Sequence, residues 1–372
     1  MAVWDATADP GLLSVLHPGV PGDLHRGADV VVVGGGAVGL ATAAACRREG
    51  LGRVLVLEAG RLAGTASGRA AGILAPEPHA WSEPAAFVEL GRRSLRLTWE
   101  LDAETGGALG VRSLASLLAG VRVEDAPCPL AAPVEALDGA GVREVEPAVA
   151  GIEQAVLVGG QARVDPLRLA AALAVRAGTV ATGVEAGALV LDGDRVTGLD
   201  TSAGRVDAGS VVFATGLAPA PHVPVAHHWV KGHLATTEPV PFRVGSQVVT
   251  PTAGVLQLDD GRLLSGGSLD EGDDSPSLQP QTLSGLRRGL DDLVPGSRGV
   301  PFSHQWCCFR PAAPDRLPII DRVPGTANAW FASGMYRTGI LLAAAVGEGL
   351  ARWMATGTPP AGLTPFGLAR FG

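Results

Sequence analysis

The sequence predicts an α/β protein that joins a Rossmann-type nucleotide-binding core to a strand-rich α+β part. A continuous apolar run, Asp29 to Val33, is followed at once by clustered glycines and then by a helix-like stretch. This order of strand, turn and helix is typical of a βαβ unit that carries a parallel sheet. Similar strand and helix patterns recur in the middle and at the end of the chain, with strand-rich segments between them.

The composition indicates a globular protein. Hydrophobic residues make up 47% and charged residues 18% of the 372 positions, enough for one large or two joined domains. A formal net charge of −8 favours no nucleic-acid surface. We expect neither a secretory signal nor a membrane span, because the start is acidic and the longest apolar run is broken by glycines. Four cysteines without CxxC spacing fit a reducing cytoplasm, where we expect the protein.

Apolar periodicity, caps and breakers predict the elements in order along the chain. Residues 1–27, punctuated by Pro and Gly, are predicted to form an extension before the first strand. Asp165 and Pro166 suit the N-cap and first position of a helix. The remaining elements are a helix at 38–49, a strand ending at Glu58, a helix from about 83 to 104, short strands and turns at 109–156, a buried strand at 210–216, strand-rich sequence at 225–264, an exposed acidic loop at 270–274 and a final helix at 339–354.

The glycine cluster predicts a dinucleotide site. Gly34, Gly36 and Gly39 have GxGxxG spacing between the first strand and the helix that begins near Val38. Such glycines allow a tight turn, close approach to a pyrophosphate and close packing of helix on strand. Glu58 ends the second strand, 19 residues after Gly39, where an acid binds a ribose hydroxyl. This acid disfavours NADP but does not separate NAD from FAD.

Five sequence blocks, in order, show a resemblance that decides between NAD and FAD. They are GTASGRAAGILAP (64–76), GQARVDPLRLAAAL (160–173), VVFATG (211–216), FRPAAPDRLPIID (309–321) and ASGMYRTGILLA (332–343). With these blocks the chain, from Asp29 onward, resembles the D-amino-acid oxidase superfamily, and within it glycine oxidase with some features of sarcosine oxidases. The resemblance implies FAD and a Rossmann-type domain of the glutathione reductase-like kind.

The resemblance also implies a division of the chain and a set of cofactor contacts. Residues 28–90, 151–220 and 305–372 would form a discontinuous FAD-binding domain, and 91–150 and 221–304 a substrate-binding domain. The first turn of the last helix would offer N–H groups to the flavin edge that gains negative charge on reduction. The cofactor residues implied are Gly34, Gly36, Val38, Gly39, Glu58, Ser67, Ala71, Gly72, Ile73, Leu74, Val184, Ala214, Gly216, Cys308, Gly334, Gly339, Ile340 and Leu341.

The substrate side is expected around two arginines. Arg310 and Arg337 match family arginines that meet the substrate carboxylate, which a guanidinium can bind through two hydrogen bonds. Tyr336 and Met335 stand beside them, and Met335 replaces a family histidine, as Thr338 replaces an asparagine. Gly254 or Val255 stands where glycine oxidases carry an aromatic residue. These departures put glycine itself in doubt as the substrate and favour a larger one.

Cys308 has two interpretations. It stands six residues before Pro314, as does the sarcosine oxidase cysteine that bonds covalently to the flavin, and neighbouring Arg310 is expected to lower its pKa. A buried free cysteine is also an ordinary small apolar residue, and the adjacent RP pair resembles the non-covalent glycine oxidases. A disulfide between Cys307 and Cys308 would be strained.

The segment HHWVKGH carries three histidines and Lys231, the only lysine. In a strand, His227, Lys231 and His233 would share one face. We expect no metal site, because no ligand lies at suitable spacing. Sheet packing is the plainer interpretation, and a proton-handling histidine or a lysine that promotes the reaction with oxygen is the other. The acidic loop DEGDD is expected to be solvated.

The resemblance implies an enzyme that oxidises a C–N bond of a small amino acid or secondary amine, with hydride transfer to FAD, imine hydrolysis, and reoxidation by O2 to hydrogen peroxide. One alternative is a flavin dehydrogenase that passes electrons to a partner subunit. Another is an FAD-binding protein that has lost its oxidase activity, and an NAD dehydrogenase ranks below both. Either a homo-oligomer or a hetero-oligomer is compatible with the sequence.

Overall fold

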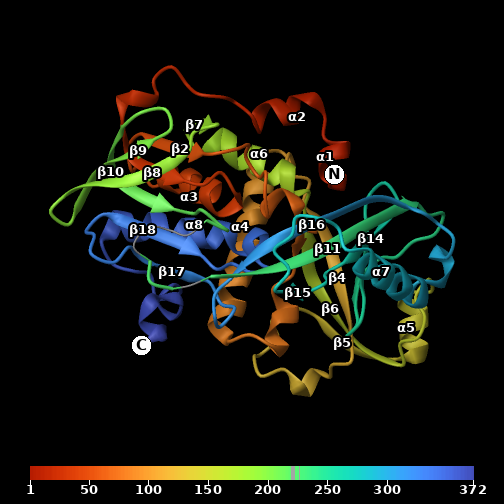
Figure 1. Cartoon of the computed structure of the whole chain (residues 1–372). Coiled ribbons are helices and arrows are strands. Elements are labelled where there is room, and N and C mark those ends of the chain that lie inside the picture. The colour runs from red at the N-terminus through yellow and green to blue at the C-terminus, as the bar shows by residue number, and fades with distance from the viewer. Residues whose placement is uncertain (219–222, 226) are drawn as a thin grey trace.

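The computed structural model describes residues 1–218, 223–225 and 227–372, so the predicted domain boundary at 220 and 221 lies outside the described residues. Its core is an eight-stranded sheet whose central strands β18, β10, β1, β2 and β7 are parallel neighbours (Figure 1). The antiparallel strands β8 and β9 extend from β10, and β17 lies at the edge. The bounds are β1 Ala28–Val33, β2 Val54–Glu58, β7 Thr179–Thr182, β8 Ala186–Asp192, β9 Arg195–Thr201, β10 Val206–Phe213, β17 Ile319–Arg322 and β18 Ala329–Ser333.

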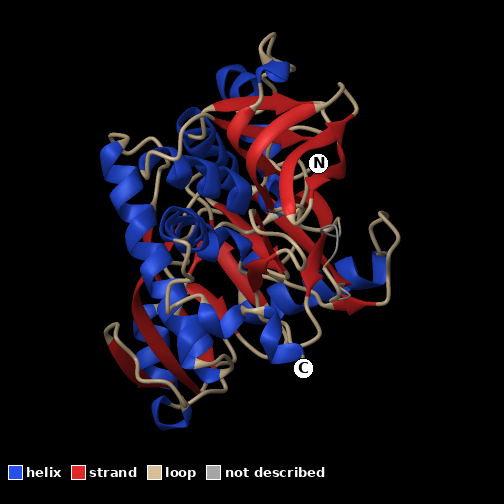
Figure 2. Cartoon of the chain, turned by 90° about the vertical axis from the view of Figure 1, so that its left-hand side faces the viewer, coloured by secondary structure: helices blue, strands red, loops and turns tan. Residues whose placement is uncertain are grey.

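Burial of both faces explains why these strands are continuous apolar runs. Along β1, Val30 and Val32 pack into the cluster that holds the helices, whereas Val31 and Val33 pack into a second cluster on the opposite face. Side chains alternate between the faces of a strand, so a parallel strand covered on both sides needs apolar residues throughout. In the upper half of Figure 2 the helices lie to the left of the strands.

The helices pack through small residues and well-formed caps. A Cβ on Gly347 of α8 would come within 2.6 Å of the backbone of Ala41 in α3, so the two helices touch closely. Helix α6 begins as predicted: Asp165 accepts hydrogen bonds from the N–H groups of Leu167 and Arg168, and Pro166 is the first helical residue. The bounds are α3 Ala37–Arg48, α4 Ala85–Glu104, α5 Gly139–Val145, α6 Pro166–Arg176, α7 Pro280–Leu293 and α8 Gly339–Thr356.

A ten-stranded sheet forms the second part of the molecule. Its longest strands, β11 and β16, pair antiparallel and run side by side (Figure 1). Strands β6 and β16 come from stretches that the sequence prediction places with the nucleotide-binding domain, and that division of the chain stays a prediction. The bounds are β3 Ile73–Leu74, β4 Arg112–Ala119, β5 Val134–Asp138, β6 Gln154–Arg163, β11 His228–Pro239, β12 Gln247–Val249, β13 Gly254–Gln257, β14 Arg262–Gly266, β15 Asp270–Glu271 and β16 Phe302–Ala312.

The N-terminal segment is part of the core rather than a loose extension. It forms the short helices α1 Val3–Thr7 and α2 Pro10–Val15. Trp4 is buried and donates a hydrogen bond from Nε1 to the carbonyl of Ala70 at 2.8 Å, and Leu16 is fully buried. The Pro and Gly content therefore marks turns between packed pieces. Within the described part of the chain, no helix combines the length and apolar character needed to cross a bilayer.

Candidate active site

A cavity of about 1040 Å³ is lined by both sheets and by the first turns of α3 and α8. Binding cavities for small molecules and cofactors are commonly 300 to about 1,000 Å³, so this one suits a large ligand. It brings together residues that are more than 300 positions apart in the sequence. The predicted site residues that line it are Gly34, Gly36, Val38, Glu58, Ser67, Ala71, Gly72, Ile73, Ala214, Gly216, Cys308, Arg310, Gly334, Met335, Tyr336, Arg337, Gly339, Ile340 and Leu341.

Three predicted residues lie outside the cavity wall. A Cβ on Gly39 would lie 1.9 Å from the carbonyl oxygen of Gly34, so this glycine lets α3 sit against the turn. Leu74 follows Ile73 in β3 and, because of strand alternation, points into the core. The N–H of Val184 donates to the carbonyl of Glu58 at 3.0 Å, so the protein itself uses that group.

The glycine turn packs closely against the residues that follow β10 and lines the cavity. Gly34 has φ +113°, and a Cβ there would lie 2.3 Å from the carbonyl oxygen of Ala214. The N–H of Ala37, in the first turn of α3, donates to Ser67 Oγ at 3.0 Å. The N-cap residue, Gly36, has no side chain that could cap the helix, so the other N–H groups of this first turn are available for an anion.

Glu58 is held at the end of β2 by the turns beside it. One carboxylate oxygen accepts from the N–H of Gly35 at 2.7 Å, and the other accepts from the N–H of Gly60 at 2.8 Å. Each carboxylate oxygen has a second lone pair for a hydroxyl donor. The carboxylate is thus fixed at the cavity wall, and its contact with a ribose stays a prediction.

The first turn of α8 forms another open wall. This helix begins at Gly339, as predicted, and its N-cap Thr338 makes no side-chain cap bond to the helix. The unpaired N–H groups and the positive end of the helix dipole favour negative charge in the cavity. Gly72, at φ +78°, lines another part of the cavity. Its backbone lies against that of Val164, and a Cβ at Gly72 would lie 2.0 Å from the carbonyl oxygen of Val164.

Arg310 lies on the wall that β16 contributes. Its guanidinium covers Gly232, where a Cβ would lie 2.0 Å from Nη2. Nη1 donates to the carbonyl oxygens of Ser268 at 2.9 Å and Lys231 at 3.3 Å, so backbone acceptors hold one side of the guanidinium. Burial lowers the pKa of Arg310, and the positive charge of Arg337 acts in the same direction. An arginine remains charged at neutral pH even so, which leaves a half-buried cation facing the cavity.

Arg337 and Tyr336 lie beside it on the segment before α8. Arg337 is exposed, and its guanidinium lies 5.4 Å from the centre of the Tyr336 ring. Tyr336 has φ +47°, in the left-handed region that residues other than glycine adopt rarely and at a cost of about 1–3 kcal/mol. Its hydroxyl is buried and has no hydrogen-bond partner in the described part of the chain. Such an orphaned group indicates a ligand as its partner.

For Cys308 the structure adds an effect that opposes the expected influence of Arg310. Burial raises the pKa of its thiol, and the positive charges of Arg310 and Arg69 offset only part of this effect. The thiol is therefore neutral at neutral pH, whereas a covalent bond to a cofactor requires the thiolate. Cys307 is also a free thiol and donates to the carbonyl of Pro276 at 3.3 Å.

Several expectations for the HHWVKGH segment are wrong. His227 precedes β11 and contacts Ser333 Oγ at 2.8 Å, while only Lys231 and His233 share a strand face. Neither side chain lines the cavity. The acidic loop is not simply solvated, because Asp273 and Asp270 pair with these two buried side chains. No group of three His, Cys, Asp or Glu side chains suited to a metal ion occurs among the described residues.

The cavity also contains residues that sequence patterns did not single out. His79 lines it from a short 3-10 helix, and burial, together with the charge of Arg337, lowers its pKa to about 4. It is therefore a neutral imidazole at neutral pH. The apolar wall comes from β4, β12, β13 and α7, for example Leu118, Val249 and Leu286. No local motif marks these residues, because only the pairing of distant strands brings them together.

Comparison with known proteins identifies the family. A family model described as FAD dependent oxidoreductase matches residues 29–353. Glycine oxidase of Pseudomonas aeruginosa is 29% identical, with 91% of this chain and 98% of that protein covered. Hydrogen cyanide synthase subunit HcnC of the same organism is 32% identical over 65% of this chain and 61% of its own length. The match thus spans less than two thirds of HcnC.

Solved structures give the same result for the fold. Glycine oxidase from Geobacillus kaustophilus has a TM-score of 0.81 at 27% identity, with 92% of this chain and 98% of that chain covered. L-Proline dehydrogenase from P. horikoshii has a TM-score of 0.84 at 18% identity, with 93% and 98% covered. The chain therefore belongs to the family of FAD-dependent oxidoreductases. The uncapped turns of α3 and α8 and the oriented carboxylate of Glu58 fit this cofactor.

Proposed function

We propose that this flavoprotein oxidises the C–N bond of an amino acid or secondary amine that carries a carboxylate. The observation that carries the proposal is Arg310, a half-buried cation that faces the same cavity as the helix turns that fit FAD. A guanidinium whose other side is fixed by backbone carbonyls is well oriented to receive a carboxylate. FAD, when bound, supplies the two-electron acceptor for the substrate Cα–H, and O2 is the proposed final acceptor.

The protein's own residues bind and orient the substrate. Arg310 anchors the carboxylate, which fixes the position of the carbon next to it, and this positioning is the main task in such a reaction. Exposed Arg337 assists by its charge at the side of the cavity. Tyr336, whose hydroxyl has no partner among the described residues, offers it to the substrate, and His79, kept neutral by its low pKa, adds no charge to this part of the cavity.

The character of the wall favours an apolar side chain on the substrate. Beyond the arginines, the part formed by β4, β12, β13 and α7 is mostly aliphatic. Each buried methylene contributes about 0.8 kcal/mol. We therefore expect kcat/KM for leucine or a similar amino acid to exceed that for glycine by about tenfold or more.

The test is reduction of the bound FAD without oxygen. The purified protein is mixed anaerobically with glycine, sarcosine, proline, leucine and phenylalanine, the chiral ones in both D and L forms. Loss of the visible flavin band with at least one of them, followed on admission of air by oxygen consumption and hydrogen peroxide, is the expected result. If no amine bleaches the flavin, the protein binds FAD without this activity.

A second candidate is a dehydrogenase that passes electrons to a partner protein. Its support is the similarity to HcnC, which is named as a subunit of hydrogen cyanide synthase. The same experiment separates the two candidates. Bleaching by an amine with slow reoxidation in air, accelerated by a soluble electron acceptor such as a quinone or dye, favours the dehydrogenase.

We also propose that FAD is bound without a covalent link. Because burial raises the pKa of the Cys308 thiol, the nucleophilic thiolate is scarce. After acid precipitation, the yellow colour is expected in the supernatant, and Cys308→Ser is expected to retain FAD to the same extent. A yellow pellet from the native chain that becomes colourless in Cys308→Ser would establish the covalent link instead.

A further inference from the structure

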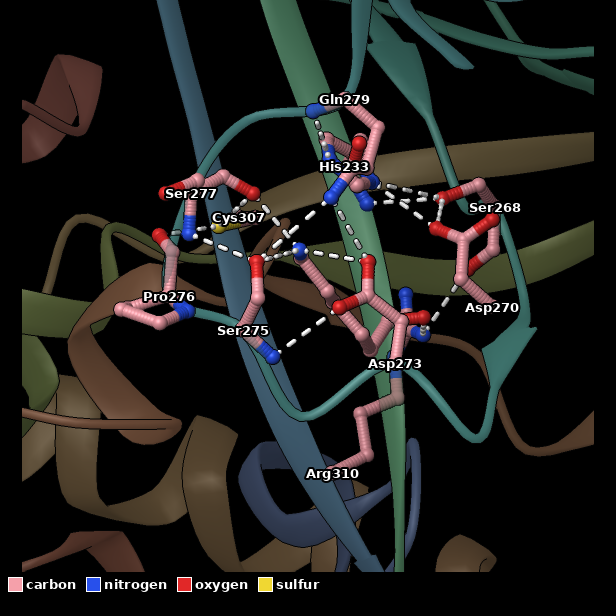
Figure 3. Close-up of polar contacts among 11 residues, drawn as sticks. His233, Ser268, Asp270, Asp273, Ser275, Pro276, Ser277, Gln279, Cys307 and Arg310 are labelled. Atoms are coloured by element: carbon pink, nitrogen blue, oxygen red, sulfur yellow. Dashed lines mark hydrogen bonds and ion pairs between the residues drawn. The ribbon is translucent and has the colours of Figure 1, made fainter. Parts of the chain in front are cut away.

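The loop at residues 267–279, between β14 and α7, is tied to two buried basic side chains of β11. Lys231 and His233 both have 0% exposure. They are two positions apart in the strand, so their side chains lie on the same face. Figure 3 shows Ser268 and Asp270 at the right of this site, Ser275 and Ser277 at the left, and Asp273 between them.

Lys231 binds the second half of the loop. Its ammonium donates to the carbonyl of Ser277 at 2.6 Å, to the Asp273 carboxylate at 2.8 Å and to Ser275 Oγ at 3.5 Å. Gln279 Nε2 donates to the same Asp273 oxygen at 3.1 Å. All three protons of the buried ammonium therefore have acceptors, and all the acceptors belong to this loop.

His233 binds Asp270 in the first half of the loop and Gln279 at its end. The backbone N–H of Gln279 donates to Nε2 at 3.0 Å, so Nδ1 carries the proton of the neutral ring and donates to Asp270 at 2.8 Å. The backbone N–H of His233 donates to Ser268 Oγ at 2.8 Å, and this hydroxyl donates to Asp270 at 2.7 Å. Ser268 is thereby fixed from two directions.

Arg310 receives its main backbone support from this fixed residue. The carbonyl of Ser268 accepts from Arg310 Nη1 at 2.9 Å. In the β11–β16 ladder, Lys231 is opposite Phe309 and His233 is opposite Cys307, whereas Arg310 is opposite Val230. Residues directly opposite share a face, so Arg310 lies on the other face from the two basic side chains. We call Lys231, His233 and their hydrogen-bond partners in loop 267–279 the clamp. The loop thus connects the clamp, on one face of the β11–β16 pair, to the Arg310 guanidinium on the other face.

Burying the charged and polar side chains of the clamp costs free energy, so a need for packing alone does not explain why these residues are polar. Replacing a buried ion pair with apolar residues of similar size is often neutral or stabilising. A polar arrangement, in contrast, has directional bonds and can fix the loop in one conformation. What depends on that conformation is the position of the Ser268 carbonyl, and with it the direction of the Arg310 guanidinium.

We propose that Lys231 and His233 are positioning residues for the substrate carboxylate, acting through loop 267–279 and the Ser268 carbonyl on Arg310. This inference rests on the proposed role of Arg310. It predicts that loosening the clamp weakens carboxylate binding more than it slows the chemical step. Lys231, His233 and Asp273 do not line the cavity, and the clamp reaches it only through Ser268 and Asp270. Amines without a carboxylate are expected to be insensitive.

The test uses the FAD-loaded chain and two single variants, Lys231→Met and Asp273→Asn. For the best amino-acid substrate we expect KM to rise about tenfold, while kcat changes less than about threefold, because the effect reaches the substrate only through the position of Arg310. The decarboxylated amine of that substrate should show the same kcat/KM in variant and native protein. A simple monocarboxylate without an amine, titrated against the flavin spectrum, should bind about tenfold more weakly.

Asp23→Asn is the matched control, because it removes an ion pair with Arg53 of 2.8 Å that does not line the cavity. It should leave all three quantities unchanged. Should Lys231→Met fail to fold, Asp273→Asn still decides, since Asp273 is partly exposed. Unchanged KM and carboxylate affinity in Asp273→Asn, or equal losses for the amine and the amino acid, would overturn the proposal. If no amine reduces the native protein, the proposed function fails, and the monocarboxylate titration still tests the clamp.

Discussion

Replacing Arg310 with leucine should lower kcat/KM for an amino-acid substrate by about two to three orders of magnitude. The variant loses the half-buried cation that we propose as the anchor of the substrate carboxylate. Truncating one partner of a hydrogen-bonded charge pair that is buried in the complex costs about 2–5 kcal/mol. Leucine preserves much of the apolar bulk over Gly232, which the guanidinium covers. Steady-state kinetics and the flavin-to-protein absorbance ratio are the measurements, and the ratio should not change.

Arg337→Leu is the comparison for that result. Arg337 is exposed, so water and salt screen its charge, and we expect a loss of about tenfold or less, one that salt reduces further. A larger loss for Arg337 than for Arg310 would reverse the proposed roles of the two arginines. A normal KM in Arg310→Leu would show that the substrate carboxylate binds elsewhere.

The nucleotide-binding part of the fold was predictable because its signals are local. The glycines, the acid at the end of β2 and the Asp165–Pro166 helix start each lie within a few residues of the element that they define. Local hydrogen bonds and positive φ angles impose the same residue types wherever such a turn occurs. The role predicted for the first turn of α8 came instead from the resemblance, through the contiguous block at 332–343, and the structure confirms that the helix begins at Gly339.

The substrate wall was not predictable in the same way, because it depends on pairing between distant segments. β12 pairs with β4, more than 100 residues away, and nothing in either sequence names the partner. His79 was missed because a single histidine after a proline carries no pattern. These residues become a site only when the register of the ten-stranded sheet is known.

Lys231 and the acidic loop show a further limit. From sequence, a run of acidic residues in a loop suggests solvation, and a lone lysine near histidines suggests a chemical role. The structure pairs them with each other, so each explains the burial or placement of the other. Cys308 shows a related limit. The sequence shows the nearby charge of Arg310, which lowers the pKa of the thiol, but not the burial that raises this pKa by more.

Gly39→Ala should abolish tight FAD binding, although Gly39 does not line the cavity. A Cβ at this position would lie 1.9 Å from the Gly34 carbonyl oxygen and 3.3 Å from the Ala214 side chain, so α3 must move away from the turn. Overpacking of this kind commonly costs about 1–3 kcal/mol of folding free energy. The same displacement would move the N–H groups of the first turn of α3, which we propose to bind the cofactor phosphates. We therefore expect FAD affinity to fall at least about a hundredfold, as for the loss of several charge-assisted hydrogen bonds.

Equilibrium dialysis with FAD and the thermal midpoint of the apoprotein separate these two effects. Gly362→Ala is the control, because a Cβ there has no neighbour within 4 Å, and both quantities should stay near their native values. A variant with native FAD affinity and an unchanged midpoint would show that the turn relaxes around the new methyl group. If the midpoint falls while affinity is retained, Gly39 serves packing alone. Only a loss of affinity larger than the loss of stability supports the argument that close packing of α3 on the turn sets the position of the phosphate-binding N–H groups.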